Sequence, residues 1–313
     1  MVSGRGRASA LACAGVLALA GCGAANGSGS DTADGGLTIA ASFYPLQWLG
    51  EQIAGTHGTV TSLTPPGVEP HEYELTPGEV AATAEADIVV YLSAYQPSVD
   101  AAVDEQAGDR AFDAAGPADL DLLYQDGHAE EHADGTHAEG VRDPHFWHDP
   151  MRMADVGDAL AEALSRADEA HRADYTANAA DLREQLTALN GEFRDGLARC
   201  ASRDVVTGHS AFGYLADAYG LRQFGISGLA PDEEPSPGAL TGATDFIREH
   251  GVRAVYAETL VSPAVAETVA RETGAQVLIL DPIEGLTDAS QGTDYLELMH
   301  ANLADLRTGQ QCS

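Results

Sequence analysis

The sequence contains no lysine. All 16 basic residues are arginines, and they face 49 acidic residues, which gives a formal net charge of −33 at pH 7. A surface this negative repels phosphate backbones, and we find no basic patch that could offset the repulsion. We therefore exclude nucleic-acid binding and expect cations to be the natural small partners. The solubility of an exported protein is an alternative explanation for the acidic excess.

After the first residues, no apolar run is long enough to cross a bilayer. The run Ala8–Ala20 follows Arg5 and Arg7, and it is too short for a transmembrane helix. A basic start, a short apolar run and small residues are typical of an export signal, so we predict residues 1–21 to be a signal peptide. Its removal takes two arginines and no acids, so the mature net charge is −33 − 2 = −35.

The segment Leu19-Ala20-Gly21-Cys22 resembles the bacterial lipobox. We predict that Cys22 is lipidated and anchors an extracytoplasmic lipoprotein to the outer face of the cell membrane. Residues 22–36, rich in Gly, Ser and Asp, then form a flexible tether. The alternative is that Cys22 is incidental to an ordinary cleavage site.

The remaining chain is long enough for two domains. Short apolar runs alternate with helical segments, which predicts an α/β fold with parallel sheets. Strands are expected at 37–43, 60–63, 87–92, 204–207, 221–226, 252–256 and 276–280. Helices are expected at 46–53, 80–86 and 154–166, and others begin near Ser210, Ser236 and Pro263.

The charged segment 170–199 carries apolar residues on one helical face, which predicts a long helix. About 28 residues would run about 42 Å, which suits a rigid spine between two lobes. We predict an N-terminal lobe at 37–168, a linking helix at 169–199 and a C-terminal lobe at 200–313. Residues 126–140 lack apolar periodicity and carry five acids and three histidines, so we expect an exposed, disordered loop.

Cysteine is scarce, with four in the chain. Once Cys13 leaves with the signal and Cys22 is acylated, Cys200 and Cys312 remain. An even pair in an oxidising compartment favours a disulfide between them. Free thiols or thiolate ligands are the alternatives, disfavoured because neither residue lies in a CxxC or CxxH context.

Three histidines lie just past strand ends or in loops: His71, His145 and His209. In open α/β sheets, ligands bind at that edge. Three neutral imidazoles and one carboxylate satisfy tetrahedral Zn²⁺, and Asp281, directly after the strand at 276–280, is our candidate carboxylate. The spacing is not a local metal motif, so proton switching and simple surface exposure remain alternatives.

Five segments match one family in the same order: Ser42–Leu46, Gly67–Tyr73, Asp143–Pro150, Val206–Tyr214 and Leu280–Pro282. From Leu37 to Cys312 the chain resembles the zinc and manganese substrate-binding lipoproteins of ABC transporters, the ZnuA-like or TroA-like family (cluster A-I).

The resemblance implies two βα lobes joined by a long backbone helix, with the metal held in the interlobe cleft by His71, His145, His209 and Asp281. It implies a receptor, not an enzyme, that delivers Zn²⁺ to an ABC-type permease with a separate ATPase subunit. We expect a monomer, because a carrier that docks on a permease has no evident need to self-associate. Manganese members tend to place Glu at the His209 position, and harder cations prefer oxygen ligands, so His209 favours zinc. A manganese-binding receptor of the same class is the alternative.

The loop 126–140 resembles the His-rich loop of zinc members, which makes His128, His132 and His137 candidates for weak binding. Ordering such a loop around an ion costs conformational entropy, so its sites should be weak. A solvated acidic insertion without a metal role is the alternative.

Two neighbours of the motif histidines are auxiliary candidates. Glu69 lies beside His71 and is a candidate to tune or bind the ion. His148, three residues after His145, departs from the family pattern. We expect His148 to be a surface residue. The alternatives are that it contacts one of the metal ligands or that it is itself an alternative ligand.

Two further classes of function remain open. A zinc hydrolase would need an open metal position and a general base, for which Glu72 or Glu234 could be nominated, but there is no HExxH helix. A metal-binding adhesin or storage protein would bind a host surface or retain several ions. The chain has no P-loop, so it is not itself the ATPase.

Overall fold

The computed structural model describes Met1 and residues 36–124, 141–231 and 234–313. Apart from Met1 and Gly36, the predicted signal peptide 1–21 and tether 22–36 lie outside the described residues. The lipidation candidate Cys22 and the whole loop 126–140 lie outside them as well.

The first lobe is built on a four-stranded parallel sheet in the order β2-β1-β3-β4. The strands are β1 (Leu37–Ala41), β2 (Gly58–Ser62), β3 (Ile88–Tyr91) and β4 (Ala111–Asp113). The helices of this lobe are α1 (Tyr44–Ala54), α2 (Pro77–Glu85), α3 (Pro97–Gln106) and α4 (Ala115–Ala118), with short 3₁₀ turns η1 (Gly55–His57) and η2 (Gly108–Arg110).

The second lobe repeats this arrangement, with strands in the order β6-β5-β7-β8. The strands are β5 (Asp204–Thr207), β6 (Arg222–Gly225), β7 (Ala254–Ala257) and β8 (Gln276–Ile279). The helices are α7 (Gly213–Tyr219), α8 (Pro237–His250), α9 (Ala264–Thr273) and α10 (Tyr295–Gly309). The predicted α/β class and the repeated element order are confirmed.

Local sequence explains where these elements begin and why the strands are continuous apolar runs. The Thr76 side chain and Glu79 form a reciprocal capping box at the start of α2. Ser236 caps α8 and Pro237 takes its first position, as the sequence predicts. Strands such as β5 and β7 are buried along their whole length, as expected where helices cover both faces of a parallel sheet.

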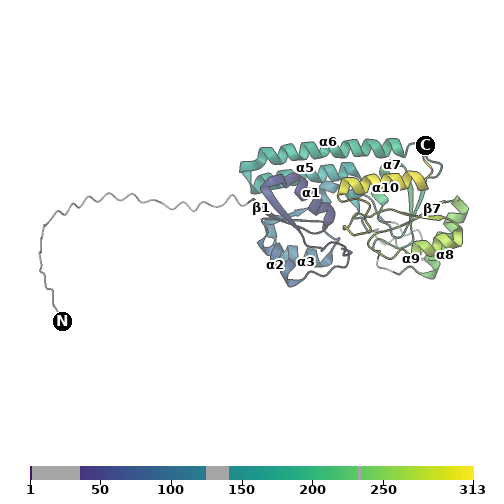
Figure 1. The fold of residues 1–313 in the computed structure, drawn as a ribbon, viewed down its shortest axis with the longest axis horizontal. Helices are drawn as coiled ribbons and strands as arrows, with labels where there is room; N and C mark the ends of the chain where they lie inside the picture. Colours follow the sequence, from purple (N-terminus) through teal and green to yellow (C-terminus); the bar gives the residue numbers. More distant parts are fainter. Residues whose placement is uncertain (2–35, 125–140, 232–233) are drawn as a thin grey trace, which may run out of the picture. The chain divides into compact units, whose positions relative to one another are not determined.

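Two antiparallel helices, α5 (Pro150–Ala167) and α6 (Arg172–Gly196), connect the lobes through the turn η4 (Glu169–His171). Figure 1 shows α6 running along both lobes. It packs on α1 of the first lobe and on α10 of the second. The apolar face read from the sequence is the buried face, formed by Tyr175, Leu182, Leu186, Leu189 and Phe193. The long helix is therefore confirmed.

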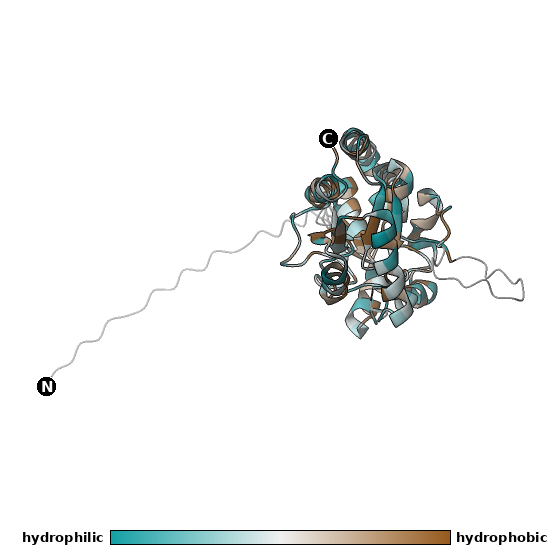
Figure 2. Ribbon diagram, turned by 90° about the vertical axis from the view of Figure 1, so that its right-hand side faces the viewer, coloured by the Kyte–Doolittle hydropathy of each residue, from teal (hydrophilic) through white to brown (hydrophobic). Residues whose placement is uncertain are grey.

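The two lobes are also joined directly beneath the spine. Trp48 of α1 stacks on Tyr295 of α10 with ring centroids 4.6 Å apart. The Trp147 indole donates to the carbonyl of Pro282, and the Tyr295 hydroxyl donates to the carbonyl of Trp147. Figure 2 views the fold with one lobe in front of the other and shows brown and teal segments alternating along its helices, as expected where one face of a helix is buried. These contacts hold the loops that face each other across the interlobe boundary.

The predicted disulfide between Cys200 and Cys312 is confirmed. It ties the C-terminal end to the segment between α6 and β5. Among the described residues, no helix combines the length and the apolar character needed to span a membrane.

Candidate metal centre

Four side chains from separate loops converge where the two lobes meet. His71 lies in the loop after β2, and His145 directly precedes the 3₁₀ turn η3 (Phe146–His148) that leads into α5. His209 follows β5 by two residues, and Glu284 lies in the segment after β8. One donor atom from each lies within 4.8 Å of the others. Each lobe therefore supplies two of the four residues.

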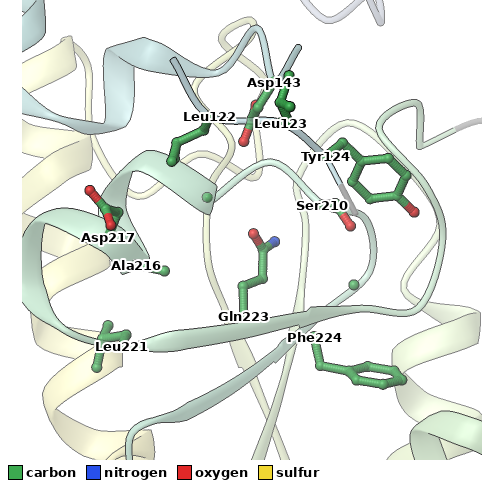
Figure 3. A pocket seen from close by; sticks show the side chains of 12 residues that line it. Leu122, Leu123, Tyr124, Asp143, Ser210, Ala216, Asp217, Leu221, Gln223 and Phe224 are labelled. Carbon is green, nitrogen blue, oxygen red and sulfur yellow. The ribbon is translucent and has the colours of Figure 1, made fainter. Parts of the chain in front are cut away.

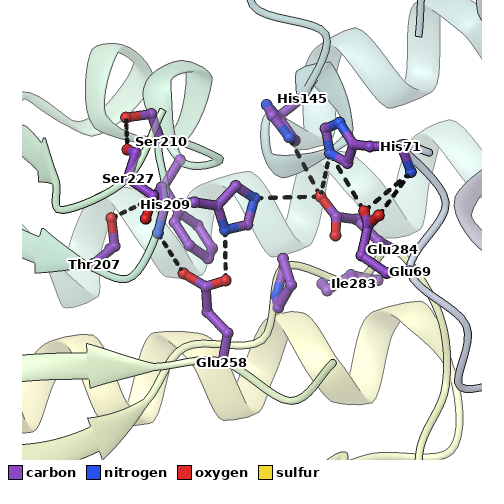
Figure 4. A network of polar contacts seen from close by, with 12 residues as sticks. Glu69, His71, His145, Thr207, His209, Ser210, Ser227, Glu258, Ile283 and Glu284 are labelled. Carbon is purple, nitrogen blue, oxygen red and sulfur yellow. Dashed lines mark hydrogen bonds and ion pairs between the residues drawn. The ribbon is translucent and has the colours of Figure 1, made fainter. Parts of the chain in front are cut away.

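The carboxylate of Glu284 lies between the three imidazoles (Figure 4). Its Oε1 atom is 3.3 Å from Nε2 of His71, 3.3 Å from Nε2 of His145 and 3.4 Å from Nε2 of His209. Glu284 and two of the histidine side chains are fully buried, whereas His71 is 9% exposed. Three nitrogens and one oxygen at one point form a donor set that suits a divalent cation of the zinc type.

The electrostatics of the cluster favour positive charge at its centre. Burial alone would raise the pKa of Glu284, but the three imidazoles lower it well below its usual range. Burial likewise opposes the charged form of His209, yet Glu258 and Glu284 raise its pKa to about 10. The pKa of His145 is also raised, because Asp143 and Glu284 outweigh its burial.

His71 differs from the other two imidazoles. Burial lowers the pKa of His71 even though Glu284 acts in the opposite direction, and the neighbouring imidazoles add to the lowering. Without a bound cation, His209 therefore carries a proton at neutral pH, and of the three rings His71 takes up a proton least readily. A cation entering the centre has to displace the proton of His209.

Two carboxylates that the sequence analysis did not single out contact the far side of two imidazoles. Asp143 Oδ1 accepts from the backbone N–H of His145 at 2.9 Å and lies 2.7 Å from its Nδ1. The Glu258 carboxylate accepts from the backbone N–H of His209 at 2.8 Å and lies 2.5 Å from its Nδ1. The sequence could have indicated Glu258, because this residue directly follows strand β7. The C-terminal end of β7 lies at the same edge of the sheet as the C-terminal end of β5, which His209 follows.

The structure does not bring Asp281 into the cluster. Asp281 is buried, but its Oδ1 accepts from the backbone N–H of Ile283 at 2.8 Å, and its own backbone is bound on both sides by Asn302. Ile283 adopts a φ of 57°, in the left-handed region. Asp281 thus shapes the turn that presents Glu284, and Glu284 occupies the place expected for it.

The surface interpretation of His148 is wrong. The residue lies inside η3, whose three side chains are all buried, and its ring packs 4.6 Å from that of Phe212. Neither ring nitrogen has a hydrogen-bond partner among the described residues. Burial lowers the pKa of His148 to about 3, so the ring is neutral at physiological pH.

The other auxiliary candidates divide between the described and the undescribed parts of the chain. Both carboxylate oxygens of Glu69 accept from the backbone N–H of His71, and its Oε1 lies 3.8 Å from Nε2 of that ring. Glu69 therefore lies at the margin of the cluster. The loop candidates His128, His132 and His137 fall outside the described residues.

A cavity of about 320 Å³ lies beside the cluster and contains none of its four residues. Figure 3 shows Asp143, Ser210 and Gln223 in its wall. The Gln223 amide donates to the carbonyl of His209 at 3.0 Å, and its oxygen accepts from the backbone N–H of Phe212. The cavity wall therefore also supports the loop that carries His209.

Two α/β lobes with parallel sheets, a helical spine and a buried cluster of three imidazoles and one carboxylate between the lobes define a two-lobed protein with a candidate metal-binding centre. The family model described as the zinc-uptake complex component A, periplasmic (ZnuA), matches residues 39–309. The chain belongs to this family.

Individual relatives agree with this assignment. The zinc-binding lipoprotein AdcA of Streptococcus pneumoniae is 34% identical over 290 residues, which are 90% of this chain and 57% of that protein. This chain thus spans little more than half the length of AdcA. The Zn(II)-bound AdcA crystal structure superposes with a TM-score of 0.73 at 32% identity, covering 88% of this chain and 58% of AdcA.

Two relatives match over nearly their whole length. The high-affinity zinc uptake system protein ZnuA of Bacillus subtilis is 32% identical over 93% of both chains. The laminin-binding protein Lmb of Streptococcus agalactiae, described as bifunctional with adhesin and metal transporting activity, is 30% identical with a TM-score of 0.76. That superposition covers 88% of this chain and 100% of Lmb.

Proposed function

We propose that this chain captures one Zn²⁺ through His71, His145, His209 and Glu284 and delivers it to an ABC-type permease driven by a separate ATPase subunit. The observation that carries the proposal is the convergence of four donor atoms from four loops within 4.8 Å of one another. A buried carboxylate surrounded by imidazoles is costly to maintain unless a cation or protons balance it.

The donor set supports zinc over manganese. Imidazole is a borderline donor that suits zinc, whereas Mn²⁺ prefers carboxylate, carbonyl and water oxygens. Here three of the four donors are imidazole nitrogens. Zinc is therefore the proposed cargo, and manganese is the competitor to test against it.

The geometry supports a carrier rather than a hydrolase. A catalytic zinc site keeps a position open for water, whereas four protein donors complete a tetrahedral shell. Glu72, the candidate general base of a zinc hydrolase, is not a member of the cluster. We propose that the protein binds and releases the ion without chemical change.

The export features complete the proposal. Residues 1–21 act as a signal peptide, Cys22 carries the lipid, and residues 22–36 tether a monomeric receptor outside the cytoplasmic membrane. The lobes extend over 37–168 and 200–313, joined by the segment 169–199 that contains α6. The name of AdcA as a zinc-binding lipoprotein supports this placement.

The metal content of the purified mature protein tests the proposal. We expect one zinc per chain by mass spectrometry after competition with equal manganese, and none in His209→Ala. The matched control is His300→Ala, which removes a half-exposed imidazole on α10 that pairs with Glu192. Retention of zinc by His209→Ala, or preference for manganese in the wild type, would contradict the proposal.

Deletion of residues 126–140 locates the site. The four proposed ligands lie outside this segment, so the shortened protein should keep its single zinc. If the deletion abolishes zinc retention while the fold is preserved, the cluster is not the principal site.

A further inference from the structure

The imidazoles of the cluster are held in two different ways. His145 and His209 each have a carboxylate behind the ring that contacts both the backbone N–H and Nδ1 of the same residue. We propose that Asp143 and Glu258 are positioning residues that fix these two imidazoles as metal ligands in advance of metal binding. The inference rests on the proposed zinc-receptor function.

The double contact determines which nitrogen faces the ion. When Nδ1 donates its proton to a carboxylate, the lone pair of a neutral imidazole is on Nε2, and Nε2 is the atom that points at Glu284 in both residues. Because the same carboxylate also accepts from the backbone N–H, it is held in place by the loop, and the ring cannot turn without breaking its contact with this carboxylate. The ring and its loop are thereby fixed together.

The arrangement occurs once in each lobe. Asp143 and His145 belong to the loop that enters α5, while Glu258 follows β7 and His209 follows β5. A divalent ion thus meets one fixed nitrogen from each side of the interlobe boundary. Fixed donors lower the entropy lost on binding, because the side chains are already ordered.

His71 provides the internal contrast. Glu69 accepts from its backbone N–H, but among the described residues no carboxylate contacts Nδ1 of His71. Its ring packs against Tyr95, with centroids 4.6 Å apart, and it is the one imidazole of the cluster that reaches solvent. If these carboxylates served only to accept from the backbone N–H groups of the loops, all three histidines would have the same contacts. The additional contacts of Asp143 and Glu258 with the imidazole rings therefore indicate a second role.

The substitutions Asp143→Asn and Glu258→Gln test the proposal with little change of shape. Asp143 lies in the wall of a cavity, so the amide has room to be accommodated (Figure 3). We expect each variant to raise the Kd for zinc by roughly 10-fold to 100-fold in a chelator competition, as loss of such partners does elsewhere. The Co(II) absorption spectrum of the saturated variants should also shift, because a loosened ring changes the ligand field.

The chain offers a matched control far from the cluster. Asp168 contacts Nδ1 of His171 at 2.6 Å, so Asp168→Asn makes the same chemical change to a histidine–carboxylate pair at the junction of α5 and α6. Its Kd for zinc and its Co(II) spectrum should equal those of the wild type. Glu258→Asp, which keeps a carboxylate, should recover part of the affinity lost in Glu258→Gln.

The outcomes separate this proposal from the proposed function. If wild-type protein binds zinc at the cluster but both amide variants keep its Kd within twofold and its Co(II) spectrum, the positioning role is overturned and the receptor remains. If the amide variants lose affinity with an unchanged Co(II) spectrum, the role is structural and the proposal also fails. If the wild type holds no zinc, the proposed function itself fails. Should Glu258→Gln not fold, Asp143→Asn and Glu258→Asp decide the matter.

Discussion

Nε2 of His145 lies 3.3 Å from Oε1 of Glu284, although the two residues belong to different lobes. Both side chains are fully buried, so the contact closes the interlobe boundary around an ionisable pair. Because the pKa of His209 in this centre is raised to about 10, an arriving cation has to replace a proton.

Replacing Glu284 by Gln should raise the Kd for zinc on the order of 100-fold or more, since it removes the one anionic donor of the cluster and about 3 kcal/mol of binding free energy. The control is Asp281→Asn, in which a neighbouring buried carboxylate of the same segment is changed. It should have the smaller effect because Asp281 contacts the backbone of Ile283 rather than the cluster. Chelator competition measures both, and a larger loss in Asp281→Asn would contradict the ligand assignment.

Zinc affinity should rise with pH beyond the range of an ordinary imidazole. The pKa of His209 is raised to about 10 in the metal-free protein, so the ring carries a proton at pH 7 that zinc must displace. The Kd should therefore increase by at least about tenfold for each unit of pH lost below 8, because one proton on His209 competes with zinc and the pKa of His145 is raised as well. Calorimetric titrations in buffers of different ionisation enthalpy would count the released protons. A Kd that is flat from pH 7 to 8.5 would contradict the prediction.

His148→Leu should stabilise the protein, and more so in acid. Neither buried nitrogen of the ring has a hydrogen-bond partner in the described part of the chain, and removing an unsatisfied buried polar group is worth about 1 to 3 kcal/mol. The pKa of His148 is lowered to about 3 against about 6.5 when unfolded, so the unfolded state binds the extra proton. Wild-type stability is therefore lost as pH falls from 6.5 towards 3, and the Leu variant should lose less. Thermal melts of metal-free protein at pH 7 and pH 5 measure the difference, and an equal loss in both proteins would refute it.

Removing the disulfide should destabilise the second lobe. Cys200 and Cys312 are 112 residues apart in sequence, and closing a loop of that length is worth about 2 to 5 kcal/mol, largely through the unfolded state. The double variant Cys200→Ser with Cys312→Ser should unfold at lower denaturant concentration yet bind zinc with unchanged stoichiometry, since Cys200 precedes β5 and His209 follows the opposite end of that strand. A melting transition insensitive to reducing agent would argue against the prediction.

The alternation of apolar runs and the buried face of α6 could be read directly from the sequence. These features are local: a strand needs a short apolar run, and a long helix needs apolar residues at helical spacing. The same holds for Ser236 and Pro237 at the start of α8. The three histidines were found because a strand end or a family segment marked each one, and the structure brings all three together.

The choice of Glu284 over Asp281 required the tertiary structure. Both acids follow β8, and both are buried, so neither composition nor position in the segment separates them. The turn after β8 determines which acid reaches the cluster. The Asp281 carboxylate accepts from the backbone N–H of Ile283, and the left-handed backbone at Ile283 directs the side chain of Glu284 into the cluster. The burial of His148 was equally invisible, because a 3₁₀ turn of three residues leaves no periodicity to read.

The sequence by itself determined the elements of this protein, because helices and strands depend on neighbours a few residues apart. It also marked three of the four converging residues. Only the tertiary structure decided that Glu284 meets these histidines and that Glu258 contacts the far side of the His209 ring. Both acids come from loops far along the chain from the histidines that they contact. Their distances depend on how the two sheets and the spine pack, which no local pattern encodes.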